Sequence, residues 1–97
     1  MTAYFVSRHP GAVAWAQRKS IVARPVEHLD INVIQRGDMV VGTLPIQLAA
    51  AVSSKGARYL HLEIDLPQEA RGRNLTADEM EQFGARLQEY RVEKIGQ

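Results

Sequence analysis

The sequence predicts a three-layer α/β sandwich around a mainly parallel sheet. Short apolar runs typical of buried strands alternate along the chain with segments of helical pattern. Two of these runs, 3–6 and 39–42, lack polar alternation, as do strands in the middle of parallel sheets that helices cover on both faces. A chain of 97 residues fits one domain, so we expect a single unit spanning residues 1–97.

The first half of the chain supplies three of the expected strands. Residues 3–6 are aromatic and β-branched and should form a buried strand, which the loop 7–11 ends. The pattern then predicts a short helix over 12–19 and a second strand at 21–23, closed by Arg24 and Pro25. Pro10 or Gly11 is tolerated near the first turn of that helix.

The middle of the chain is less regular at first. Residues 27–34 are ambiguous between irregular structure and one or two helical turns, and 35–38 turn the chain into the strand at 39–42. The next helix is expected from Thr43 to Lys55, stopped by Gly56 as a left-handed cap. Because this helix is apolar nearly all round, it should be largely buried.

The last third of the chain adds a strand and a helix. Residues 58–65 alternate, with Leu60, Leu62 and Ile64 on one face and polar side chains on the other. Thr76 and Glu79 form the pattern of a capping box at a helix start. The helix is expected to continue through apolar residues spaced by three and four, before a last strand at 92–95; these residues are Met80, Phe83, Leu87 and Tyr90.

Composition narrows the classes of function. The chain has no cysteine, which excludes disulfides and thiolate zinc sites. A formal net charge of +1 offers no general attraction for long nucleic acid. The start of the chain lacks a signal-peptide pattern, and no apolar stretch approaches the ~20 residues that span a bilayer. We therefore expect a cytoplasmic protein without a membrane partner.

Two loops are candidates for a ligand site. In parallel sheets, ligands bind at the carboxyl ends of the strands, where loops enter the following helices. The loop 7–11 places a hydroxyl, a guanidinium, an imidazole and a glycine after the first strand, and the loop 42–45 follows the third. If those two strands are neighbours, both loops open onto one crevice. Amides near Thr43 and Leu44 could face an anion there, and Gly42 would admit a ligand close to the backbone.

Each of these loops also has a purely structural reading. Thr43 could serve only as the N-cap of a helix with Pro45 in its first turn. His9 could merely hydrogen-bond its own loop, whereas Arg8 follows a core strand directly and is the stronger functional candidate. The segment 71–73, with two arginines around Gly72, is most often a solvated loop and less often a lid over a phosphate.

Other polar groupings carry little specificity. His28 with Asp30, and the run His61, Glu63 and Asp65, resemble metal ligands, but side chains two apart on a strand merely share a face. Ser7, His9 and Asp30 imitate a hydrolase triad without the G-x-S-x-G elbow. Neither G-x-x-x-x-G-K nor G-x-G-x-x-G occurs. We expect no metal and no cofactor.

Several stretches together resemble a short CRISPR-associated accessory family of type III loci. They follow one another through most of the chain and comprise 4–12, 28–30, 42–45, 48–50 and 66–72. The resemblance implies a Rossmann-like fold akin to the CARF (CRISPR-associated Rossmann) domains. It also implies a ring nuclease, an enzyme that opens cyclic oligoadenylate messengers, chiefly cyclic tetra-adenylate, and so ends an antiviral response.

Residue roles follow from chemistry and placement. We expect metal-independent cleavage, with Arg8, His9 and Ser7 catalytic and five residues binding the ligand: Gly11, Gly42, Thr43, Leu44 and Arg71. A symmetric ring too large for one crevice favours a homodimer. The strand 58–65 or the loop near Arg71 could close that shared pocket. Two alternatives stay open: a protein that binds the messenger without cutting it, and a protein-interaction subunit without a nucleotide site.

Overall fold

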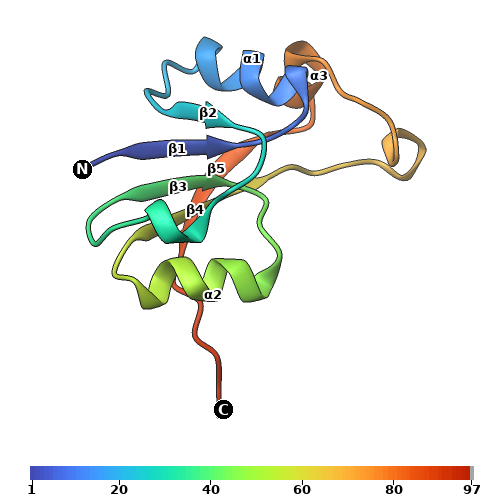
Figure 1. Ribbon diagram of the computed structural model, residues 1–97. Coiled ribbons are helices and arrows are strands. Elements are labelled where there is room, and N and C mark those ends of the chain that lie inside the picture. The colour runs from blue at the N-terminus through green and yellow to red at the C-terminus, as the bar shows by residue number, and fades with distance from the viewer. Residues whose placement is uncertain (97) are drawn as a thin grey trace.

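The computed structural model describes residues 1–96 as one five-stranded sheet flanked by helices (Figure 1). Strands and helices alternate along the chain, as the sequence predicts. The elements in order are β1 (Ala3–Val6), α1 (Pro10–Arg18), β2 (Arg24–Val26), the 3₁₀ turn η1 (Ile31–Val33), β3 (Met39–Gly42), α2 (Ile46–Ser54), β4 (Arg58–Glu63), the 3₁₀ turn η2 (Gln68–Ala70), α3 (Ala77–Gln82) and β5 (Arg86–Tyr90).

The sheet has the strand order β2-β1-β3-β4-β5. Its first four strands are parallel, and β5 pairs antiparallel with β4 at one edge. Helices α1 and α3 lie on one face and α2 on the other, which makes three layers (Figure 1). The predicted α/β sandwich with a mainly parallel sheet is confirmed, and its arrangement is compatible with a Rossmann-like fold. Strands β1 and β3 are neighbours, which is the condition for a shared crevice.

Each face of the sheet carries its own apolar core. Under α1 and α3, Trp15 is buried against Phe5 and Met80. Under α2, Tyr59 and Val52 are buried with Val40. Because successive side chains of β4 point to opposite faces of the sheet, this strand contributes Leu62 to one core and Tyr59 to the other. None of the helices within residues 1–96 is long and apolar enough to cross a membrane.

The second strand lies three residues later than the sequence predicts. Strand β2 is Arg24–Val26. The predicted run 21–23 is instead the turn that follows α1, because Ser20, with φ 59°, reverses the chain there. The N–H of Ile21 then donates to the Ala16 carbonyl. The side chain of Val22 is 89% exposed, so it does not enter the core. Pro25 is accommodated because β2 is an edge strand, where a missing N–H costs least.

The C-terminal helix is much shorter than its apolar spacing indicates. The capping box of Thr76 and Glu79 forms as predicted. Helix α3 then ends at Gln82, and Gly84, with φ 74°, reverses the chain into β5. Leu87 and Tyr90 therefore belong to a strand and not to a helix. The strand expected at 92–95 is not formed; the sheet's last strand is β5.

Helix α2 is half-buried, contrary to the expectation of a largely buried helix. Only Ala49 and Val52 are buried, and Ile46 is 74% exposed. Pro45 occupies the N-cap position and no side chain caps the helix, so the reading of Thr43 as N-cap is wrong. Gly56 ends the helix region with φ 80°, as predicted.

Candidate functional site

A cavity of about 170 Å³ opens at the carboxyl ends of β1, β3 and β4. Its floor is apolar and includes the buried side chains of Phe5, Leu62 and Met80. Polar residues of the loops after β1 and β3 and before α3 line the rest: Ser7, His9, Thr43, Arg73 and Asn74. An apolar floor with a few convergent polar groups is the usual form of a small-molecule site.

The parallel register of β1 and β3 brings the two predicted loops together. Val6 lies opposite Gly42, the last residue of β3. A β-carbon at Gly42 would lie 2.7 Å from the Val6 carbonyl oxygen, so the close approach requires glycine. Ser7, His9 and Thr43 consequently reach one cavity, as the sequence predicts for adjacent strands.

The loop after β1 is held by its own backbone. The N–H of Ser7 donates to the Val26 carbonyl at 3.0 Å, which ties the loop to β2. The N–H of His9 donates to Ser7 Oγ at 3.1 Å. His9 is the N-cap residue of α1 but makes no side-chain cap, so its exposed imidazole is available to a ligand.

Arg8 points to a second hollow on the other side of this loop. That open hollow, of about 500 Å³, is also lined by Gln17, Val26 and Glu27. Ser7 and His9 line both hollows, which therefore meet along the loop. A ligand that crosses Ser7 and His9 would contact Arg8 in one hollow and the apolar floor in the other.

The loop after β3 offers fewer free amides than expected. The N–H of Leu44 donates to the Tyr59 hydroxyl at 2.9 Å, so this amide already has a partner. Burial raises the pKa of Tyr59 above its usual range, which keeps the phenol protonated. Thr43 is exposed beside the cavity and remains the group of this loop best placed to meet a ligand.

Gly11 has a packing role that the sequence did not indicate. A β-carbon there would lie 1.8 Å from the Leu75 carbonyl oxygen. Helix α1 can approach the start of α3 only with glycine at this position, and Leu75 lines the cavity. Gly11 thus affects the shape of the cavity through the position of Leu75.

The segment 71–73 contributes Arg73 to the cavity, and not Arg71. Arg73 pairs with Glu79 at 2.7 Å, and this hydrogen bond lowers the pKa of the Glu79 carboxyl. Glu79 also closes the capping box with Thr76, so the arginine is attached to the start of α3. The capping box was the signal in the sequence that could have favoured Arg73 over Arg71.

The residues that resembled metal ligands and the acid of a hydrolase triad have other partners in the structure. Within residues 1–96, no group of three or more His, Cys, Asp or Glu side chains could hold a metal ion. Asp30 accepts the N–H of Asn32 and caps η1. The ring of His61 contacts the Tyr59 hydroxyl on the α2 face of the sheet.

Comparison with known proteins agrees with a CRISPR connection. No curated protein and no solved structure gave a significant match. Residues 4–93 match a protein family described as "Putative CRISPR-associated protein (Cas_VVA1548)". The matched region runs from β1 to just beyond β5 and includes every residue of the cavity. This chain therefore belongs to that family of CRISPR-associated proteins.

Proposed function

We propose that this protein is a ring nuclease that opens cyclic tetra-adenylate and so ends type III CRISPR signalling. The observation that carries the proposal is the cavity at the carboxyl ends of the parallel strands, where Ser7, His9 and Thr43 surround an apolar floor. Membership of a CRISPR-associated family supports a role in CRISPR defence. The class of ligand is what the resemblance described above implies.

The size and lining of the cavity suit one adenine base. Pockets for drug-sized ligands measure ~300–1,000 Å³, so a cavity of about 170 Å³ takes only a smaller group. A flat base would rest on Phe5, Leu62 and Met80. Asn74 at the rim could then exchange hydrogen bonds with the polar edge of adenine. The attached ribose and phosphate would lie over the loop of Ser7 and His9.

The reaction needs no metal. The ribose 2′-oxygen attacks the adjacent phosphorus and forms the new P–O bond, while the bond to the 5′-oxygen breaks. The 2′-hydroxyl proton passes to a base, and a proton is returned to the departing 5′-oxygen. The products are linear adenylates with 2′,3′-cyclic phosphate and 5′-hydroxyl ends.

The loop after β1 carries most of this chemistry in the proposal. His9 suits proton transfer near neutral pH. Arg8 stabilises the charge that grows on the phosphate oxygens in the transition state. Ser7 and Thr43 hold the ribose or a phosphate oxygen. A two-fold homodimer presents every one of these groups twice to the symmetric ring.

The test is incubation of the purified protein with radiolabelled cyclic tetra-adenylate, followed by separation of the products. We expect linear products with 2′,3′-cyclic phosphate ends. Retention of intact ring on the protein would instead identify a binding protein that sequesters the messenger. An unchanged melting temperature with saturating ligand would identify a protein-interaction subunit without a nucleotide site.

A further inference from the structure

The Tyr59 hydroxyl joins three groups at the end of β3 and β4. It accepts the N–H of Leu44 at 2.9 Å and lies 3.1 Å from the Gly42 carbonyl oxygen. It also lies 2.6 Å from Nδ1 of His61. Tyr59 is only 2% exposed, so water does not compete for these bonds. The hydroxyl thus connects the loop after β3 to an imidazole that the proposed reaction has not yet used.

The number of hydrogen bonds that a phenol can donate and accept determines which of these three groups is the donor to Tyr59 and which is the acceptor. A tyrosine hydroxyl has one proton to donate and two lone pairs that accept. An imidazolium carries protons on both ring nitrogens, so protonated His61 must donate through Nδ1 to Tyr59. Tyr59 then accepts from Leu44 and His61 and donates its own proton to Gly42. The three bonds coexist whenever Nδ1 of His61 carries a proton, in the imidazolium as in the neutral Nδ1–H tautomer. In the imidazolium, Nε2–H is the second donor and makes none of these bonds.

The ring of His61 is also held on both sides. It packs edge-on against the rings of Tyr59 and Tyr90, with centroids 5.8 and 6.0 Å away. Of the two ring nitrogens of His61, Nδ1 makes the hydrogen bond to Tyr59, and Nε2 makes none within residues 1–96. These contacts hold the half-buried imidazole in one orientation.

The charged groups around His61 come from β4 and β5. Glu63, on the same face of β4, accepts a hydrogen bond from the Tyr90 hydroxyl. Its other carboxylate oxygen lies 3.6 Å from Nε of Arg86. Strand β3 places Gly42 opposite His61, which adds no side chain. Helix α2, which covers this face, contains no charged residue. The carboxylate and the guanidinium are thus paired with one another.

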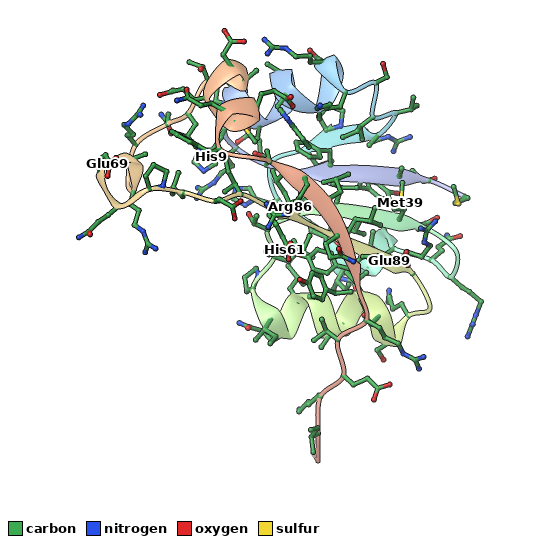
Figure 2. All side chains as sticks on the ribbon, turned by 180° about the vertical axis from the view of Figure 1, so that it is seen from behind. His9, Met39, His61, Glu69, Arg86 and Glu89 are labelled. Atoms are coloured by element: carbon green, nitrogen blue, oxygen red, sulfur yellow. The ribbon has the colours of Figure 1, made fainter. Side chains whose placement is uncertain are left out.

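His61 and His9 flank the same loop from opposite faces of the sheet. Neighbouring strands lie about 4.8 Å apart, so the backbone of His61 lies beside that of Gly42, a residue that lines the cavity. Figure 2 shows both histidines toward one end of the sheet, away from Met39 at the start of β3. His9 lines the cavity on the α1 side.

We infer that His61 is the general acid of the reaction, an inference that rests on the proposed ring-nuclease function. Its Nε2–H protonates the 5′-oxygen as the P–O5′ bond breaks, while His9 takes the proton of the attacking 2′-hydroxyl. His9 takes up one proton and His61 gives one, so the number of protons on the enzyme and substrate together is unchanged. Tyr59 is a positioning residue, because it orients His61 and the loop without touching the substrate.

The test compares cyclic tetra-adenylate with an analogue in which sulfur replaces each bridging 5′-oxygen. A thiolate leaves without protonation, so only the oxygen substrate needs the acid. In single-turnover assays, His61→Asn should cut the oxygen substrate about 10²–10⁴-fold more slowly. It should cut the sulfur substrate within about threefold of wild type. Asparagine keeps a donor near the position of Nδ1, and His28→Asn, at an exposed site, is the matched control.

Two further variants separate the roles. His9→Asn should slow cleavage of both substrates, because a base is needed for each. Tyr59→Phe should slow the oxygen substrate more than the sulfur one, whereas a merely structural role would slow both equally. Equal slowing of both substrates by His61→Asn, or no slowing, would overturn the assignment while leaving the nuclease intact. A wild-type protein that cuts neither substrate would overturn the proposed function itself, and this inference with it.

Discussion

Gly11 and Leu75 are packed so closely that no side chain fits between them. A β-carbon on Gly11 would lie 1.8 Å from the Leu75 carbonyl oxygen. Gly11→Ala should therefore push α1 from the start of α3 and lower the free energy of unfolding by about 1–3 kcal/mol. Urea denaturation measures this change. Gln17→Ala, at an exposed position of the same helix, is the control and should stay within about 0.5 kcal/mol of wild type.

Arg8→Ala should remove most of the cleavage activity without unfolding the protein. The Arg8 side chain is exposed, so its loss should change the free energy of unfolding by no more than about 0.5 kcal/mol. Loss of one preorganised donor to the transition state typically costs on the order of a hundred- to a thousandfold in rate. Single-turnover assays and melting temperatures check both numbers, with Arg91→Ala on the C-terminal segment as control. Cleavage within threefold of wild type would shift the assignment to Arg73.

Cleavage should persist in excess EDTA. The proposed reaction uses the substrate's own 2′-hydroxyl and two imidazoles, and no step passes through a metal. The rate of ring opening is compared before and after exhaustive chelation. Activity that disappears with EDTA and returns with manganese would contradict this mechanism.

The protein should be a homodimer in solution. In the proposed function, one cavity of about 170 Å³ takes one base, while the ring has four bases, so further subsites must come from elsewhere. A second copy supplies the same loops by symmetry. Light scattering at micromolar concentration should give twice the chain mass of 10.8 kDa. A clean monomer mass would remove the shared pocket.

Asp38 should make stability depend on pH. Its carboxylate accepts the N–H of Thr2 at 2.9 Å and that of Gln35 at 3.0 Å, and these bonds lower its pKa from 3.8. The bonds therefore stabilise the fold fully above the unfolded-state pKa and are lost as pH falls through the lower folded-state pKa. Asp38→Asn should unfold more easily than wild type at pH 7, with a gap that narrows toward pH 2 (about two pH units below the unfolded value). Glu69→Gln, at an exposed site, should show no such gap at pH 7.

Local patterns in the sequence predict the alternation of the fold but not where each element ends. The run at 21–23 has the composition of a strand, yet Ser20 turns it away and Arg24–Val26 pairs with β1 in its place. Likewise, Phe83 and Leu87 keep a helical spacing across Gly84, where the chain reverses. Strand pairing decided both cases, and it depends on residues far away in the sequence.

The candidate site shows the same limit. Because both loops follow neighbouring parallel strands, the sequence correctly predicted that Ser7, His9 and Thr43 line one cavity. The engagement of the Leu44 amide could not be foreseen, because its partner, Tyr59, is 15 residues away on another strand. The alternation of β4 did mark His61 as polar, but only the register with Gly42 sets it beside the loop.

The proline in β2 limits the pairing of a further strand with this edge of the sheet. Strand β2 is a sheet edge of three residues with Pro25 at its centre, so it offers an incoming strand an incomplete row of donors. Continuation of the sheet from one copy into the next is thereby discouraged at this edge, and with it the stacking of chains into fibrils. The opposite edge of the sheet, β5, has five residues and no proline, so a strand of another copy would find its regular row of donors and acceptors there.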